Sequence, residues 1–189
     1  MESYKFLFIA VLFIIIGCSQ NKVADEAANI DMAIGEVSTM ELKSNAFGHN
    51  ARIPAKYTCD GKNISPPLSI GSVPEDAEAL VLIMDDPDVP KSIRADGMWD
   101  HWVVFNIPVS VREIPEGKNP DGVLGKNTGG KNEYIGPCPP DREHRYFFKV
   151  YALDTKLNLQ KGAGKADVEK AMKGHILAQA TLIGLYKRG

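Results

Sequence analysis

The stretch Ala79-Leu80-Val81-Leu82-Ile83-Met84, continued by Asp85-Asp86-Pro87-Asp88-Val89-Pro90, decides the fold class. An unbroken apolar run of this length is typical of a strand that is buried on both faces of a sheet. Proline fixes its own φ angle and restricts the residue before it, so Asp86 and Val89 are expected to be extended. The segment therefore predicts a buried strand that delivers its carboxylates to the rim of a sheet. Taken alone, the acidic part also fits a plain polar turn.

Four other runs predict further strands, namely 39–47, 101–107, 145–153 and 180–187. Clusters of proline and glycine separate these runs, as expected of turns and loops. Helical spacing is clear only around 166–173, where Val168, Ala171 and Met172 recur on one face. We therefore predict a mainly β domain with a small helical part.

The first residues indicate export and lipid attachment. The apolar run 6–16 is shorter than the roughly 20 residues that a membrane-spanning helix needs, but it fits a signal peptide. Ile15-Ile16-Gly17-Cys18 resembles the lipobox of bacterial lipoproteins, in which the cysteine receives a lipid and becomes the mature N-terminus. An uncleaved anchor helix and a signal cut elsewhere are the alternatives. We predict a signal peptide over 1–17 and a lipid-anchored domain in the cell envelope, outside the cytoplasm.

Behind Cys18, the composition separates a tether from a globular part. Residues 18–35 lack aromatic side chains and are rich in Ala, Asn, Asp and Glu, so they bury too little apolar surface to offset the entropy of ordering. Residues 36–189 have the usual size of a single domain. The chain has a formal charge of −2 and no basic run, which argues against nucleic acid as a partner.

The globular part contains two cysteines, Cys59 and Cys138, an even pair for a compartment outside the cytoplasm. One disulfide would join them. Two separate buried thiols are the alternative, because free cysteine behaves as a small hydrophobe. The sequence leaves both possibilities open.

Two more segments carry side chains suited to a site. One is Trp99-Asp100-His101-Trp102, which opens a predicted strand. The other runs from Gly136-Pro137-Cys138-Pro139-Pro140 through Asp141-Arg142-Glu143 to His144-Arg145-Tyr146, a stiff loop that leads into the strand over 145–153. Side chains alternate across a strand, so His144 and Tyr146 are expected on one face. Arg145 then lies on the other face, where it would pair with a carboxylate or carbonyl and hold the loop.

These segments, in this order, resemble the phosphatidylethanolamine-binding protein family. The resemblance rests on the Asp86-Pro87-Asp88-Val89-Pro90 stretch, on Asp100-His101-Trp102 and the strand behind it, on Gly-Pro-Cys-Pro-Pro and on His144-Arg145-Tyr146. Residues 57–68 and 174–178 are similar to its bacterial Raf-kinase-inhibitor-like branch. The resemblance covers about residues 36–189. It implies a large central antiparallel sheet, a smaller second sheet and a short C-terminal helical part.

The resemblance also implies a small surface pocket for an anionic or phosphorylated ligand, such as phosphate or a phosphoethanolamine-like head group. Its lining would be Asp86, Asp88, His101, Pro139, Pro140, His144 and Tyr146. We expect Asp86 and Asp88 to orient both histidines and to favour their charged form, so that they donate to phosphate oxygens. The charged link 141–143, where relatives often carry a longer glycine-containing one, places Glu143 near the pocket and opposes simple anion affinity.

The predicted function is that of a membrane-tethered binding protein without a cofactor or catalytic residues. A protein partner is implied by the kinase inhibitors, protease inhibitors and signalling adaptors of the family. One alternative is a structural envelope lipoprotein with a vestigial pocket. Another is a metal-dependent hydrolase, since two His and two Asp would suit zinc, although no close His pair occurs in the sequence. Residues 125–132 nearly form a phosphate loop, but Asn132 replaces the required hydroxyl, and no Gly-x-Ser-x-Gly elbow exists.

Overall fold

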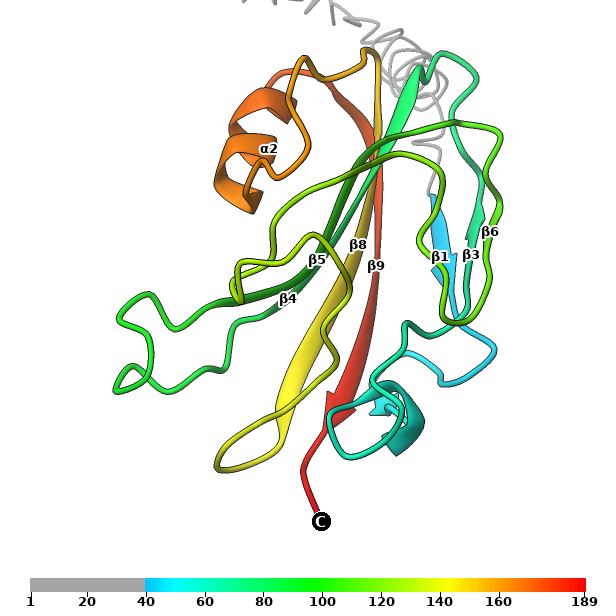
Figure 1. The fold of residues 1–189 in the computed structure, drawn as a ribbon. Helices are drawn as coiled ribbons and strands as arrows, with labels where there is room; N and C mark the ends of the chain where they lie inside the picture. The colour runs from blue at the N-terminus through cyan, green and yellow to red at the C-terminus, as the bar shows by residue number, and fades with distance from the viewer. Residues whose placement is uncertain (1–39) are drawn as a thin grey trace, which may run out of the picture. The chain divides into compact units, whose positions relative to one another are not determined.

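The apolar run at 79–84 forms strand β4 (Ala79–Asp86), which lies inside a six-stranded sheet in the computed structural model (Figure 1). The model describes residues 40–189, so the predicted signal peptide over 1–17, Cys18 and the tether over 18–35 lie outside the described residues. Every residue of β4 is buried, as predicted. The sheet has the order β2-β9-β8-β4-β5-β7. Its other strands are β2 (Ala51–Arg52), β5 (Trp99–Ile107), β7 (Val123–Leu124), β8 (His144–Leu153) and β9 (Ile176–Tyr186).

Four pairs of neighbouring strands in this sheet are antiparallel, and the fifth pair, β2 with β9, is parallel. A second sheet has the order β1-β3-β6 and consists of β1 (Glu41–Lys43), β3 (Leu68–Gly71) and β6 (Glu113–Ile114). The helical elements of residues 40–189 are a 3-10 turn, η1 (Ala55–Tyr57), and α2 (Lys165–Met172). The predicted fold class, mainly β with two sheets and a short helix near the C-terminus, is confirmed.

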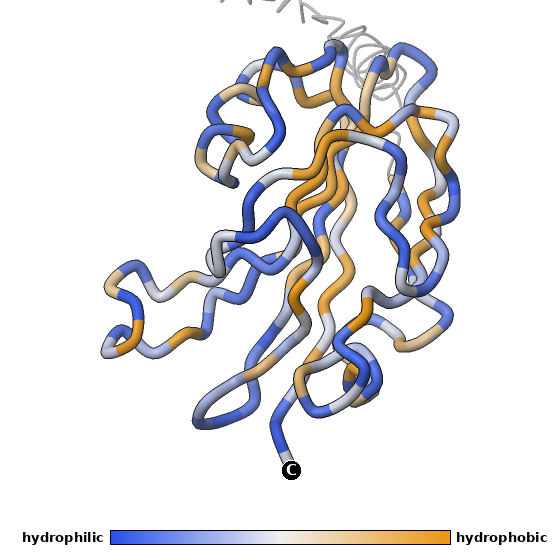
Figure 2. The backbone as a smooth tube through the Cα atoms, in the orientation of Figure 1, coloured by the Kyte–Doolittle hydropathy of each residue, from blue (hydrophilic) through white to orange (hydrophobic). Residues whose placement is uncertain are grey.

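The two faces of the large sheet are covered by different elements. Leu42 and Ile70 of the small sheet pack in one hydrophobic core with Leu82 of β4. Ile83, the next residue of β4, belongs to a second core with Val168 of α2 on the opposite face. Figure 2 shows the hydrophobic residues concentrated along the central strands, between these two layers. None of the helices within residues 40–189 is long and apolar enough to span a membrane.

Two predicted strands have limits that differ from those in the structure by more than two residues. Of the predicted strand 39–47, residues 40–47 are described, and within them only Glu41–Lys43 pairs as a strand. The Ser44 hydroxyl donates to the carbonyl of Pro67 at 2.6 Å and accepts the Ala46 N–H at 3.1 Å, which ends the pairing there. Strand β9 begins at Ile176 rather than 180, because β8 continues to pair with it as far as Leu153.

A β-bulge in β5 sets the direction of a candidate site residue. Met84 of β4 pairs with Trp102, but the next residue, Asp85, pairs with Asp100, so His101 has no opposite residue in β4. A bulge of this kind turns the extra side chain toward the face of its neighbour. His101 therefore shares the face of Trp102 instead of alternating away from it.

Candidate functional site

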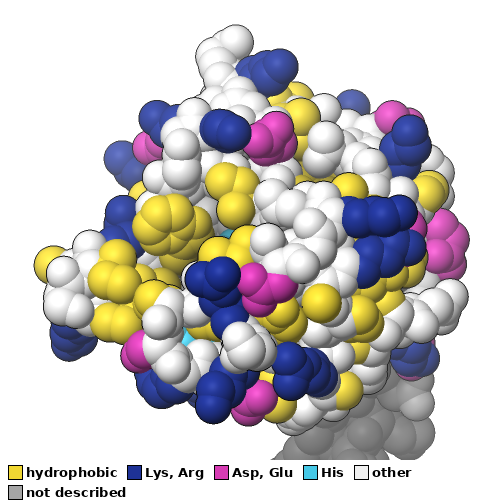
Figure 3. All heavy atoms as spheres, turned by 60° about the horizontal axis from the view of Figure 1, so that its bottom comes forward, with side chains coloured by type: hydrophobic (Ala, Val, Ile, Leu, Met, Phe, Trp, Pro, Cys, Tyr) yellow, Lys and Arg dark blue, Asp and Glu magenta, His cyan; other side chains and the backbone are white. Residues whose placement is uncertain are grey.

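A pocket lies at the end of the large sheet where β4 stops and β5 and β8 begin. Its volume is about 270 Å³, near the lower limit of the roughly 300–1,000 Å³ that is usual for ligand sites. Polar side chains from three strands form its floor, namely Asp86, His101 and His144. The walls are mostly apolar and consist of Val89, Ile93, Trp99, Ile135, Cys138 and Pro140 with Gly136. Figure 3 shows histidine atoms between hydrophobic side chains in this hollowed face.

His144 is the most constrained of the floor residues. Its side chain is fully buried at the start of β8, and its neighbour Arg145 is exposed, so the predicted alternation is correct. Its Nδ1 lies 2.7 Å from Oδ2 of Asp86, and its Nε2 lies 2.8 Å from Oδ1 of Asp141. An ionised carboxylate only accepts hydrogen bonds, so two such partners require protons on both ring nitrogens. Hydrogen bonds from His144 and from the Arg142 N–H hold the pKa of Asp141 below its ordinary range.

The surroundings of His101 oppose the charged form that was expected. Its Nδ1–H donates to the Ile135 carbonyl at 2.7 Å, and the Ile135 N–H donates back to the His101 carbonyl at 3.0 Å. Burial lowers the pKa of His101, although that hydrogen bond and the charge of Asp86 act in the opposite direction. The expectation that neighbouring carboxylates keep His101 charged is therefore wrong. A neutral ring that donates through Nδ1 leaves Nε2 as an acceptor.

Asp88 holds the pocket entrance together instead of lining the pocket. Its carboxylate accepts two hydrogen bonds from the Arg145 guanidinium, at 2.8 and 2.9 Å, and one from the Arg145 N–H at 3.0 Å. These contacts lower the pKa of Asp88, the side-chain hydrogen bond of Arg145 contributing most. The predicted pairing of Arg145 with a carboxylate is present, so the expectation that Asp88 orients a histidine is wrong. Asp86 instead accepts the Asp88 N–H at 2.8 Å, which fixes the turn after β4.

Tyr146 lies beneath the floor rather than at the pocket surface. It is fully buried, with its ring 5.3 Å from that of His101 and 6.5 Å from that of His144. Its hydroxyl makes no hydrogen bond of ordinary geometry with the described residues, although burial and the neighbouring Asp86 raise its pKa. Tyr146 therefore supports both imidazoles by packing. Of the predicted proline turn, Pro140 lines the pocket, whereas Pro139 lines an adjoining hollow.

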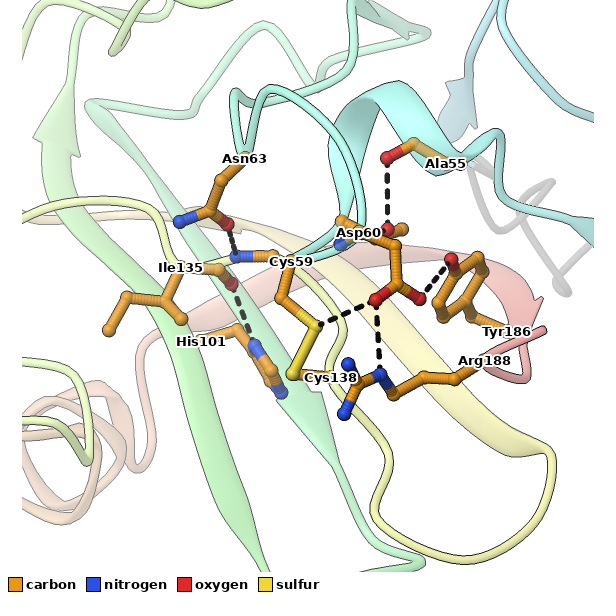
Figure 4. The surroundings of a disulfide bond; sticks show 11 residues. Ala55, Cys59, Asp60, Asn63, His101, Ile135, Cys138, Tyr186 and Arg188 are labelled. Atoms are coloured by element: carbon orange, nitrogen blue, oxygen red, sulfur yellow. Dashed lines mark hydrogen bonds and ion pairs between the residues drawn. A yellow bond between two sulfur atoms is a disulfide. The ribbon is translucent and has the colours of Figure 1, made fainter.

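A disulfide ties down one wall of the pocket (Figure 4). In the structure Cys59 and Cys138 are bonded, which is one of the two possibilities that the sequence leaves open. The Gly136 N–H also donates to the Asn63 side chain at 2.7 Å, and the Cys59 N–H donates to the Pro137 carbonyl at 3.0 Å, so hydrogen bonds and the disulfide together attach the wall to the loop after η1. Asp60 in that loop accepts hydrogen bonds from Tyr186 at 2.8 Å and Arg188 at 3.0 Å. The wall is thereby joined to the end of β9.

Several residues of the site were not predicted. The wall residues Trp99, Ile135 and Ile93 lie beside the sequence motifs of the pocket, and their apolar character was the available signal. The contact of Asp141 with His144 was also not predicted, because the charge of the link 141–143 does not reveal it. Among residues 40–189, no group of three or more His, Cys, Asp or Glu side chains is arranged to hold a metal ion.

Comparison with known proteins agrees with this architecture. The family model described as phosphatidylethanolamine-binding protein matches residues 43–187. The UPF0098 protein of Methanothermobacter thermautotrophicus is 54% identical over 156 residues, which cover 79% of this chain and 100% of the relative. The UPF0098 protein of Chlamydia trachomatis is 49% identical, covering 79% of this chain and 99% of the relative.

Two solved structures are similar to the chain. The crystal structure of CT736 from Chlamydia trachomatis, described as a homolog of phosphatidylethanolamine-binding protein, has 48% identity and a TM-score of 0.78, covering 80% of this chain and 99% of its own. The structure of E. coli YbcL, described as a member of the mammalian PEBP family, has 30% identity and a TM-score of 0.72, covering 79% and 99%. The matched part of this chain thus spans almost the whole length of both solved chains.

The fold and the family match thus define a mainly β protein of a binding-protein class. The chain belongs to the phosphatidylethanolamine-binding protein family, and its expected likeness to the bacterial branch is confirmed.

Proposed function

We propose that this protein is a membrane-tethered binding protein whose pocket holds a small ligand through a phosphate or a similar anionic group. The observation that carries the proposal is the contact at the pocket floor between His144 Nε2 and a carboxylate oxygen of Asp141, at 2.8 Å. An anionic oxygen therefore already lies against the buried imidazole. Phosphate oxygens form the same charge-assisted hydrogen bonds to a protonated histidine.

The pocket walls support a ligand with an apolar part as well. Val89 and Ile93 face the cavity from the loop between β4 and β5, and Trp99 faces it from the start of β5. Ile135 and Pro140 face it from the opposite loop. Ligand pockets commonly combine such apolar walls with a few polar groups that fix orientation. The small volume suits a head group or a short phosphate ester, and free phosphate would use the polar floor alone.

We propose binding rather than catalysis for this pocket. Its lining contains no serine, threonine or lysine, and its one cysteine, Cys138, is in the disulfide. The hydroxyl, thiol and amine nucleophiles of serine, threonine, cysteine and lysine are therefore not positioned there. A role in inhibiting a kinase or protease, or as a signalling adaptor, would follow if the phosphate group belongs to a protein partner. Lipid on Cys18 would keep the domain at a membrane surface.

The test is an NMR titration of a shortened chain, residues 19–189, with inorganic phosphate and with phosphoethanolamine. We expect amide shifts that saturate by millimolar ligand and cluster at His101, Gly136 and His144. A His144→Ala variant should lose them. A His175→Ala variant serves as the matched control, because His175 is half-exposed and pairs with Asp154 away from the pocket lining.

Backbone spectra of each variant establish that it is folded before ligand is added. If the wild-type amides do not move with either ligand, the proposed function is wrong. The structural lipoprotein role then becomes the working hypothesis.

A further inference from the structure

The imidazole of His144 has no free nitrogen for a ligand in this structure. Asp86 accepts from Nδ1 and Asp141 accepts from Nε2, at 2.7 and 2.8 Å. The ring is fully buried, so water does not substitute for either partner. A phosphate group can therefore bond to His144 only if one of the two carboxylates leaves.

The two carboxylates differ in how firmly they are held. Asp86 is buried at the end of β4 and also accepts the Asp88 N–H. Asp141 lies on the loop between the proline turn and β8, and 47% of its side chain is exposed. Moving Asp86 would leave a buried charge without a partner, whereas moving Asp141 transfers a half-exposed carboxylate into solvent. Asp141 is therefore the partner that can be exchanged.

The structure also offers a destination for the released carboxylate. Asp141 lines a shallow hollow together with Arg142, Lys187 and Arg188. Arg188 is already paired with Asp60 at 3.0 Å. The Lys187 ammonium has no ion-pair partner among residues 40–189. An Asp141 carboxylate displaced from His144 would thus remain in a hollow that contains three cationic side chains.

We propose that Asp141 is the specificity-determining residue of the pocket, an internal anion that a ligand's phosphate oxygen must displace to reach His144 Nε2. The inference rests on the proposed function of the pocket. It implies that a ligand needs a negatively charged oxygen, because an uncharged head group does not compete with a carboxylate for an imidazolium. It also implies that the wild-type protein binds phosphate more weakly than its site chemistry allows, since the apparent dissociation constant is the intrinsic one divided by the fraction of molecules with an open site.

The test compares Asp141→Asn and Glu143→Gln in residues 19–189, with dissociation constants for inorganic phosphate and phosphoethanolamine from NMR titration. Each variant removes one negative charge from the same loop. The Glu143 side chain makes no hydrogen bond or ion pair with the described residues, so it is the matched control for charge alone. We expect Asp141→Asn to tighten binding about fivefold or more, and Glu143→Gln to change it less than about twofold.

Three results decide the matter. If the wild type binds and both variants gain affinity equally, the inference is overturned and the proposed function stands. The same holds if Asp141→Asn binds more weakly than the wild type. Binding that becomes measurable only in Asp141→Asn supports both. If neither the wild type nor a folded variant binds either ligand, the proposed function and this inference are overturned together.

Discussion

Replacing His144 by alanine should destabilise the domain by about 3 kcal/mol, because it leaves the Asp86 carboxylate buried without its charged partner. Both side chains are at most 5% exposed, so solvent screens their interaction little. The usual cost of breaking a buried pair is about 3–5 kcal/mol, and the remaining hydrogen bond from the Asp88 N–H places this case at the lower end. Asp86→Asn should cost about 2 kcal/mol by the same reasoning.

A double-mutant cycle isolates the pair. If the two side chains act as a unit, the double variant should lose about 3 kcal/mol rather than the sum of the single losses, a coupling of about 2 kcal/mol. The free energies come from urea unfolding of residues 19–189 at pH 7. For a domain of this size, the His144→Ala loss corresponds to a fall in Tm of about 6–12 °C.

The control is His175→Ala, which removes a histidine–aspartate contact of similar length, 2.8 Å to Asp154. Both of its side chains are nearly half exposed, so the loss should stay below about 1 kcal/mol. A coupling energy between Asp86 and His144 below about 0.5 kcal/mol would refute the claim that the two side chains stabilise the domain as a unit. So would a loss at His175 as large as the loss at His144.

Three other perturbations have definite expected outcomes. Replacing Cys59 and Cys138 by serine opens a crosslink across 79 residues, and should lower the free energy of unfolding by up to about 4.5 kcal/mol in denaturant titrations; an unchanged midpoint contradicts this. Because burial lowers the pKa of His101, the unfolded chain binds a proton that the folded chain does not. The free energy of unfolding should then fall as the pH drops below about 6.5. His101→Gln should reduce this dependence on pH between pH 7 and pH 5, whereas an unaltered dependence would assign it to other groups. Finally, Cys18→Ser in the full chain should abolish lipid labelling and move the protein from the membrane to the soluble fraction, unless an uncleaved helix anchors it.

The large sheet was predictable because its central strands carry long, locally readable signals. The run at 79–84 needs burial on both faces, and proline and glycine mark where the runs end. The small sheet was harder to predict, since β1, β3 and β6 have only two to four residues each and show too little periodicity. The end of β1 depends on the bond from Ser44 to Pro67, a contact between distant segments.

Within the site, the consequences of side-chain alternation were predictable, whereas those of strand register were not. Alternation correctly gives the buried side of His144 and the exposed side of Arg145. The orientation of His101 depends on a bulge, which is defined by the pairing of β5 with β4 and not by β5 alone. The charge of His101 depends on burial created by the assembled pocket, and burial outweighs the nearby carboxylates. Asp141 reaches His144 through the shape of the loop, which its composition does not reveal.

The central claim, that the pocket holds a phosphate group, is tested most directly by a crystal structure of residues 19–189 grown with phosphoethanolamine. We predict density for the phosphate at the pocket floor, with an oxygen at hydrogen-bond distance from His144 Nε2 and the Asp141 side chain turned away. Density for the phosphate elsewhere, or an empty floor at a concentration that saturates the NMR shifts, would contradict the claim.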